Sequence, residues 1–230
     1  MELSRRLQAV ADFVSDGVVL ADVGTDHGYI PIYLLQQGRI QKAIAMDVNK
    51  GPLQRAQEHL EAYKLADKAE TRLSDGTSAL QAGECECVVI AGMGGALTIR
   101  IMENGRDVFT SLKEFILQPQ SELGKVRKYL QENEYCVVAE NMVFEDGKFY
   151  PMMKVVNGKT ASYSEMELQY GKYLLAEKHP VLQEFLKKEA STKEQILHNL
   201  NVEAGEHIRT RYEEVQTELS LIHKALACYE

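Results

Sequence analysis

The chain has 230 residues, of which 45% are hydrophobic and 26% charged, which excludes a disordered or fibrous protein and fits one α/β domain with an accessory piece. No apolar run approaches the roughly 20 residues that span a bilayer, and no apolar signal core follows Met1, so we expect a cytoplasmic protein without a membrane segment. The net charge of −8 argues against a surface that binds nucleic acid on all sides, although it permits a basic patch on one face.

Short apolar runs alternate with helical patterns up to residue 156. Amphipathic stretches at 31–37 and 51–63 predict helices between the runs. This alternation predicts a mostly parallel sheet covered by helices on both faces. The runs that predict strands are Val18–Val23, Ala43–Asp47, Glu70–Leu73, Cys87–Ala91, Glu114–Gln118, Tyr135–Asn141 and Phe149–Val156.

The last two of these runs are separated only by Glu145-Asp146-Gly147-Lys148, and an Asp-Gly pair at this place predicts an antiparallel hairpin. A mostly parallel sheet that ends in an antiparallel hairpin resembles the Rossmann-like methyltransferases. We therefore predict an α/β fold in which residues 1–160 form such a sheet.

From Ser162 the pattern becomes helical, and we predict a helical extension over residues 161–230. Val181–Leu200 is apolar at helical spacing, a heptad seam lies near the C-terminus, and Asn201–Gly205 can turn the chain between them. We expect an antiparallel coiled-coil hairpin; the alternative is that these helices pack on the first domain. The seam consists of Ile208, Tyr212, Val215, Leu219, Ile222 and Leu226.

The loop after the first strand indicates the type of ligand. The strand ends in Asp22, and Gly24 and Gly28 precede the next helix, at the edge where open α/β sheets bind ligands. A dinucleotide fingerprint starting at Gly24 would need glycine in place of Asp26 and Tyr29, and Asp26 would face the pyrophosphate. The loop instead favours a ligand with a cationic end and no phosphate, such as S-adenosylmethionine, which Asp22 can attract.

Two further acids stand at the ends of the next strands. Asp47 can accept hydrogen bonds from both hydroxyls of a ribose, and Asp75, followed by Gly76, can accept one from an adenine amino group. A single aspartate at a strand end is more often a helix cap or turn former. Three such acids at successive strand ends together favour an S-adenosylmethionine site.

The fourth strand runs into Ala91-Gly92-Met93-Gly94-Gly95, where methyltransferases usually border their active site; the alternative is a tight turn. Enzymes that methylate amino groups of nucleic acids typically place Asn/Asp-Pro-Pro-Tyr/Phe here, so methylation of an amino group is disfavoured. The four cysteines, Cys85, Cys87, Cys136 and Cys228, lack zinc-site spacing. We therefore expect reduced thiols and no metal ion.

These segments are similar to those of the bacterial tRNA (adenine-22-N1)-methyltransferases. The resemblance covers essentially the whole chain, including the helical extension. Its motifs are Asp22–Pro31, Ile90–Gly95, Leu117-Gln118-Pro119, Arg6-Leu7 and Gly147-Lys148-Phe149-Tyr150. It implies that the substrate is adenine 22 in the D-arm region of certain tRNAs and that the product is 1-methyladenosine. The residues that it implies for the cofactor loop, the ribose, the adenine and the methyl-transfer pocket are Asp22, Gly24, Gly28, Asp47, Asp75, Gly76, Ala91, Gly92 and Met93.

Methyl transfer to adenine N1 moves positive charge from the sulfonium to the adenine ring, so a carboxylate near the base would assist it. We expect Asp26 to be this catalytic group; the alternative is that it caps the following helix. His27 and Tyr29 can stack on or hydrogen-bond the target base, and Tyr150, with Lys148, can reach the RNA from the hairpin turn.

The helical extension supplies candidate phosphate contacts, each of which can equally be an ordinary surface charge: Lys187, Lys188, Lys193, Arg209 and Arg211. We expect a monomer that binds tRNA and S-adenosylmethionine. Two other functions fit the residues: a methyltransferase for a small molecule or a protein, in which the coiled coil makes a dimer, and a non-catalytic module that retains the cofactor pocket.

Overall fold

The structure, a computed structural model, describes residues 1–200 and 206–230. It divides into two compact units, Met1–Ser162 and Tyr163–Glu230, with a boundary two residues after the expected one. The turn expected at Asn201–Gly205 lies outside the described residues. None of the described helices combines the length and the apolar character that crossing a membrane requires.

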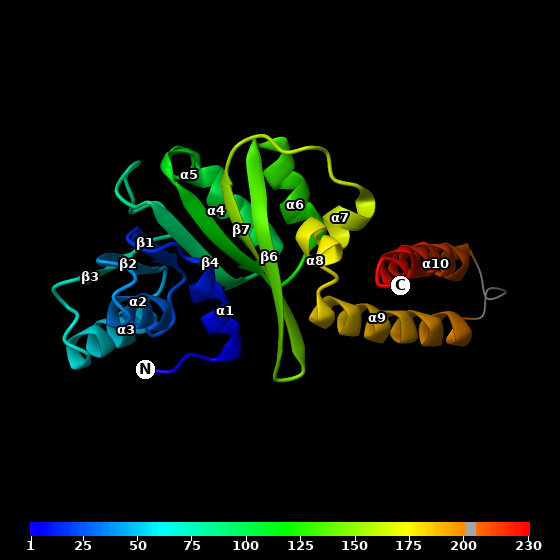
Figure 1. The fold of residues 1–230 in the computed structure, drawn as a ribbon, viewed down its shortest axis with the longest axis horizontal. Coiled ribbons are helices and arrows are strands. Elements are labelled where there is room, and N and C mark those ends of the chain that lie inside the picture. Colours follow the sequence, from blue (N-terminus) through cyan, green and yellow to red (C-terminus); the bar gives the residue numbers. More distant parts are fainter. Residues whose placement is uncertain (201–205) are drawn as a thin grey trace. The chain divides into compact units, whose positions relative to one another are not determined.

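The first unit is a seven-stranded sheet with helices on both faces (Figure 1). Its strands are β1 (Val19–Val23), β2 (Lys42–Asp47), β3 (Ala69–Leu73), β4 (Cys87–Met93), β5 (Glu114–Pro119), β6 (Tyr135–Glu145) and β7 (Lys148–Asn157). Its helices are α1 (Arg5–Phe13), α2 (Tyr29–Gln36), α3 (Lys50–Ala62), α4 (Gly95–Asn104), α5 (Arg106–Ser111) and α6 (Leu123–Glu132).

The strands are arranged in the order β3-β2-β1-β4-β5-β7-β6. The first five in sequence pair in parallel, and β7 is antiparallel to both of its neighbours. Asp146 and Gly147 have φ angles of 48° and 77°, and a two-residue type I′ hairpin turn requires a positive φ at both central residues. The prediction of a mostly parallel Rossmann-like sheet with a terminal antiparallel hairpin is therefore confirmed.

The core lies on both faces of this sheet. Helices α1, α2 and α3 cover one face, where Cys87 and Val89 of β4 meet Ile32 of α2 in one buried cluster. On the other face the rings of Phe109, Phe115 and Tyr135 pack edge to face, with centroids 5.2 and 5.3 Å apart, a favourable geometry for aromatic pairs. Because the central strands are buried on both faces, they read as continuous apolar runs in the sequence.

The second unit consists of helices α7 (Glu165–Tyr170), α8 (Lys172–Ala176), α9 (Pro180–Asn199) and α10 (Glu206–Ala227). Helices α9 and α10 run antiparallel, since Lys193 pairs with Glu218 and the Tyr229 hydroxyl donates to the carbonyl of His179 at 3.0 Å. All six residues of the predicted seam are buried or half-buried, while most positions between them are exposed. The helical prediction is therefore confirmed, and a supercoil between the two helices stays a prediction.

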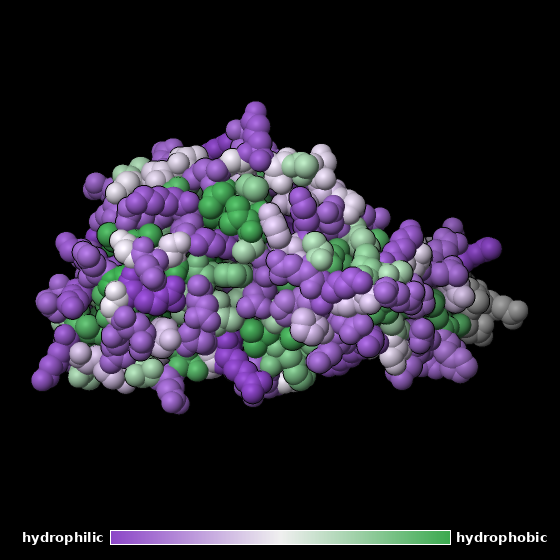
Figure 2. Space-filling view, viewed as in Figure 1, coloured by the Kyte–Doolittle hydropathy of each residue, from purple (hydrophilic) through white to green (hydrophobic). Residues whose placement is uncertain are grey.

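The outer surface is polar on the face shown in Figure 2, where hydrophobic side chains form separate patches among hydrophilic ones. Inside the first unit, however, one charged pair is almost completely buried. The Arg127 Nε atom of α6 donates to Glu140 Oε1 of β6 at 2.8 Å, and the two side chains are 2% and 1% exposed. This pair ties α6 to the hairpin.

Replacing Glu140 by leucine removes one member of this pair and leaves a buried guanidinium without its charge partner. We expect Glu140→Leu to lower the free energy of unfolding by about 3–5 kcal/mol, measured by urea denaturation followed by circular dichroism. Arg127→Met in addition should restore most of the loss, because an apolar pair of similar volume needs no charge compensation.

Glu132→Ala is the matched control. Its pair with Lys128, also on α6, spans 3.9 Å between side chains that are 58% and 63% exposed, so its loss should change stability by less than about 0.5 kcal/mol. Equal effects of Glu140→Leu and Glu132→Ala would show that the buried pair does not stabilise the fold.

Candidate functional site

The carboxyl ends of four adjacent parallel strands form one edge of the sheet. The register pairs Val23 of β1 with Met46 of β2 and Ile90 of β4, and Asp47 of β2 with Leu73 of β3. The loops that follow these strands therefore meet at this edge. The acids predicted to bind a cofactor lie at or next to the ends of β1, β2 and β3.

The loop after β1 is held by the neighbouring strand. The backbone N–H groups of Gly24 and Thr25 both donate to the carbonyl of Met46 at 2.8 Å. Gly24 has a φ of 75°, and a Cβ there would lie 2.1 Å from Met93 Cε. Position 24 therefore needs glycine for its left-handed backbone, whereas the flexible end of the Met93 side chain, which covers it from β4, can shift to make room for a Cβ.

A pocket of about 340 Å³ opens beside this loop. Six of the predicted site residues line it: Asp22, Gly24, Asp26, Tyr29, Ala91 and Gly92. Its other walls are Arg6, Leu7, Ile30 and Gln120. The remaining predicted residues do not line this pocket: Gly28, His27, Asp47, Asp75, Gly76, Met93 and Tyr150.

Asp22 is the buried acid of the pocket, with 6% of its surface exposed. Burial is the main reason why its pKa is raised to about 6, and the charge of Asp47 raises it further. Within the described residues its carboxylate has no ion-pair partner. A buried carboxylate that lines a pocket and has no ion-pair partner is suited to receive a cationic ligand.

Asp26 has an exposed carboxylate on the same pocket wall. Its Oδ1 atom lies 3.3 Å from Arg55 Nη2 on α3 and 3.3 Å from His27 Nε2, and its side chain is 70% exposed. Helix α2 begins after Gly28 and has no side-chain cap, so the alternative of Asp26 as a helix cap is wrong. Arg55 Nη2 and His27 Nε2 thus hold this carboxylate next to the pocket.

Asp47 and Asp75 lie beyond the pocket, along the same edge. Asp47 Oδ1 accepts a hydrogen bond from the backbone N–H of Asn49 at 2.7 Å, so this acid also shapes the turn into α3. Asp75 is exposed, beside Gly76. Val48 and Leu73, next to these acids, are 60% and 54% exposed. Bare apolar side chains between hydrogen-bond acceptors fit the ribose and adenine of S-adenosylmethionine.

An aromatic cluster adjoins the loop. The rings of His27 and Tyr29 are near parallel with centroids 5.1 Å apart, and both stack with His59 of α3 at 5.4 and 5.8 Å. Tyr29 alone of these three lines the pocket. His59 was missed by the sequence reasoning because it lies in the last turn of α3, 32 residues from His27.

Arg6 and Gln118 are further site residues without a predicted role. Arg6 Nη1 donates to Gln118 Oε1 at 3.1 Å, and the same oxygen accepts from the N–H of Gly92 at 3.1 Å. The guanidinium lies over the ring of Tyr150, 5.4 Å from its centroid, so Tyr150 supports the pocket through Arg6. Gln118 is fully buried, and its Nε2 has no partner in the described part of the chain. The sequence contains one indication of Arg6 and Gln118, because both lie in motifs that carry the resemblance to the family, Arg6-Leu7 and Leu117-Gln118-Pro119.

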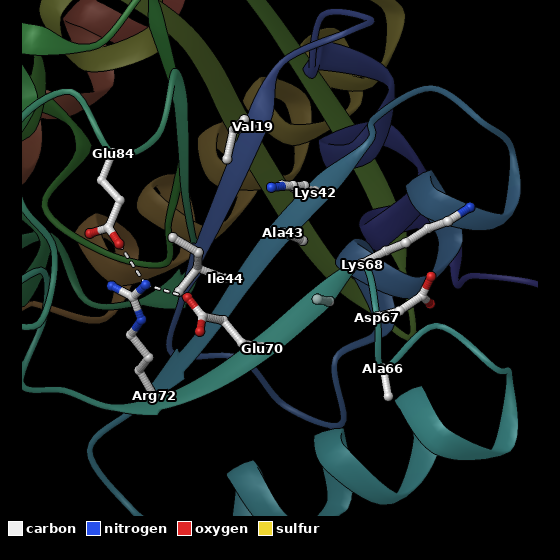
Figure 3. A pocket seen from close by; sticks show the side chains of 11 residues that line it. Val19, Lys42, Ala43, Ile44, Ala66, Asp67, Lys68, Glu70, Arg72 and Glu84 are labelled. Carbon is white, nitrogen blue, oxygen red and sulfur yellow. Dashed lines mark hydrogen bonds and ion pairs between the residues drawn. The ribbon is translucent and has the colours of Figure 1, made fainter.

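A second hollow, of about 450 Å³, lies at the opposite edge of the sheet, where the strands begin. Figure 3 shows the guanidinium of Arg72 between the carboxylates of Glu70 and Glu84, with Lys42 and Lys68 farther round the rim. These contacts with Arg72 lower the pKa of Glu84. Arg72, Glu70 and Glu84 therefore neutralise one another. Because open α/β sheets bind ligands at the other edge, this hollow is not the candidate site.

The thiols contribute no chemistry to the site. All four cysteines are free, and burial raises the pKa of Cys85 to about 11, which keeps it protonated and unreactive. Among residues 1–200 and 206–230 no group of three His, Cys, Asp or Glu side chains is placed to hold a metal ion.

Comparison with known proteins gives consistent results. The family model described as tRNA (adenine(22)-N(1))-methyltransferase matches residues 20–224. The protein of that name from Bacillus subtilis (strain 168) is 36% identical over 193 residues, 82% of this chain and 80% of its own length.

Two solved structures are similar over nearly the whole chain. One is a Streptococcus pneumoniae protein in complex with S-adenosyl-L-methionine, with 34% identity and a TM-score of 0.89 over 98% of this chain and 100% of that one. The other is an M. capricolum protein in complex with the cofactor product S-adenosyl-homocysteine, with 26% identity and a TM-score of 0.88 over 100% of both chains.

The raised pKa of Asp22 predicts a pH-dependent stability. The folded protein holds the Asp22 proton up to a pH of about 6, whereas the unfolded chain releases it near pH 4. The stability that this proton supplies is therefore present at low pH and is lost as the pH rises through about 6. Asp22→Asn cannot ionise, so at pH 8 it should unfold at a higher urea concentration than the wild type. Its free energy of unfolding should be larger by on the order of 2–3 kcal/mol.

The difference between Asp22→Asn and the wild type should shrink toward zero near pH 4, as circular dichroism in urea would show at both pH values. A difference that is the same at pH 4 and pH 8 would contradict the raised pKa.

Proposed function

The chain belongs to the tRNA (adenine(22)-N(1))-methyltransferase family, and we propose that the pocket at the carboxyl edge of its sheet is where it carries out this reaction. It is an enzyme that transfers a methyl group from S-adenosyl-L-methionine to N1 of adenine 22 in tRNA, giving 1-methyladenosine. The observation that carries the assignment to this pocket is the buried Asp22 carboxylate, which has no cationic partner in the described residues.

We assign the cofactor to the line of acids along the edge. Asp22 would attract the cationic methionine end, and Gly24 and Gly28 would let the loop lie close to it. Asp47 would accept the ribose hydroxyls, and Asp75, with Gly76, the adenine amino group. Val48 and Leu73, which are exposed beside these acids, would cover the faces of the adenine, and Ala91 and Gly92 would leave room for the reacting groups.

The bound cofactor supplies an electrophilic methyl group on a sulfonium. Adenine N1 has an in-plane lone pair and no proton to lose; as N1 bonds to the methyl carbon, the carbon–sulfur bond breaks and its electron pair stays on sulfur. Positive charge thus moves to the adenine ring. The chain contributes alignment of the two reactants and a carboxylate, Asp26, that stabilises the new charge.

The target base must leave its stack so that N1 becomes accessible. Tyr29, on the pocket wall, and His27, stacked on it at 5.1 Å, would contact the extruded adenine. Met93, which covers Gly24, would border the path of the methyl group. Tyr150 would act through the guanidinium of Arg6, 5.4 Å from its ring.

Contacts with the rest of the tRNA would come from exposed cations of each unit, so binding should weaken as salt rises. Lys148 on the hairpin turn and Lys187 and Arg209 in the helical unit are exposed. Lys188 is also exposed. Lys193 and Arg211 pair with Glu218 and Glu214, so they are weaker candidates than Lys148, Lys187 and Arg209. We further propose that the enzyme acts as a monomer in the cytoplasm, where its tRNA substrate is.

The function is tested with labelled S-adenosyl-L-methionine and unmodified tRNA transcripts. We expect label in 1-methyladenosine at position 22 and none in a transcript with guanine 22. Asp22→Asn, which should be more stable than the wild type at pH 8, should lose at least about tenfold in cofactor affinity because the charge pair is absent. Label at any other position, or only in a protein or a small molecule, would refute the assignment.

The role of Asp26 has a separate test. Asp26→Asn should lower the single-turnover rate by about a hundredfold, as loss of a group that stabilises transition-state charge does, with cofactor affinity unchanged. Arg55→Gln is the matched control, because it removes the 3.3 Å contact with Asp26 and keeps the carboxylate. Equal losses in both variants would mean that Asp26 acts only through its pair with Arg55.

A further inference from the structure

A further cavity adjoins the methyl-transfer pocket. Its volume is about 440 Å³, and its walls include Leu3, Leu7, Tyr29, His59 and Tyr63. Leu7 and Tyr29 line both cavities, so the two spaces share a wall. None of the proposed cofactor residues lines this second cavity, which we call the aromatic cradle.

The cradle is built from ring faces and aliphatic side chains. The rings of Tyr29 and His59 are near parallel, with 21° between their planes and 5.8 Å between centroids. Tyr63, one helical turn beyond His59, is 41% exposed. Exposed or half-exposed rings that line a cavity are suited to receive a flat, apolar-faced partner such as a nucleobase.

The charges near the cradle are compatible with an RNA backbone. Glu2 is the one carboxylate among its lining residues. Arg5 and Lys64, next in sequence to the lining residues Ser4 and Tyr63, are exposed, and neither has an ion pair within the residues that the structure describes. Two cations at the rim can meet the phosphates on either side of a bound base.

We propose that the aromatic cradle binds the base of a nucleotide directly next to adenine 22. This inference rests on the proposed function. Extruding adenine 22 into its pocket unstacks the neighbouring nucleotides, and the shared wall places the cradle one step along the RNA chain. Stacking in the cradle compensates for the lost RNA stacking and so holds the target base out of its helix. Leu7 and Tyr29 lie on the wall shared with the target base, whereas His59 and Tyr63 would contact only the neighbouring base.

The test is a cycle of protein and RNA changes on the full chain. Tyr63→Ala should lower kcat/KM for tRNA by roughly tenfold to a hundredfold, as the loss of one base–aromatic stack does, with the affinity for S-adenosyl-L-methionine unchanged. Removing the base at position 21 or at position 23 of the transcript should cause a similar loss with the wild-type enzyme. With the abasic transcript at the correct position, Tyr63→Ala should cause almost no further loss.

Two controls distinguish the loss of base stacking from a general disturbance of the fold by Tyr63→Ala. Tyr63→Phe retains the ring and should restore most of the rate. Phe144→Ala removes an aromatic side chain that is 40% exposed and lines neither cavity. It should change kcat/KM by the same factor on the intact transcript and on both abasic transcripts.

The inference would be overturned if Tyr63→Ala lowered kcat/KM by the same factor on the intact transcript and on the transcripts that lack the base at position 21 or at position 23. Methylation of adenine 22 by the wild type in that experiment would leave the proposed function intact. Absence of methylation at adenine 22 by the wild type would instead refute the proposed function.

Discussion

Parallel pairing of β3, β2, β1 and β4 is the constraint on which the site depends. Parallel strands must all end at the same edge, so the loops after them meet without any further design. The strands are buried between helices on both faces, which prevents a slip of register that would turn buried side chains toward solvent. Asp22, Asp47 and Asp75 come together because this pairing holds.

The buried charges of the first unit are of two kinds. Arg127 and Glu140 neutralise each other within the core, and although burial raises the pKa of Glu114, its contacts with Lys154 and Ser15 lower that pKa overall. Asp22 differs because it forms no ion pair with any cation of the described residues, although Arg6 lines the same pocket. Its ionised form therefore destabilises the folded protein at neutral pH, and a cationic ligand removes this cost. Stability and cofactor binding oppose each other at this residue.

The hairpin connects the start of the chain to the pocket. Glu145, at the end of β6, accepts hydrogen bonds from the backbone N–H groups of Arg5 and Arg6 at 2.7 and 3.4 Å. Tyr150 of β7 lies under the Arg6 guanidinium, and Gln118 of β5 holds its Nη1. Three strands thus fix one helix terminus, and that terminus also supplies Leu7 to the wall between the pocket and the aromatic cradle.

The sequence by itself determined the strands, the parallel sheet with its hairpin, the helical second unit and the acids at the strand ends, because periodicity and strand-terminal residues are local features of a chain. Tertiary structure alone decided the insertion of β7 between β5 and β6. It also decided the pairing of Asp26 with Arg55, the roles of Arg6 and Gln118, and the place of His59 beside Tyr29. These depend on contacts between residues far apart in the chain, such as Asp26 with Arg55, 29 positions apart, and Arg6 with Gln118, 112 positions apart. A single sequence has no periodic signal for such contacts, since only packing of the helices against the sheet brings these residues together.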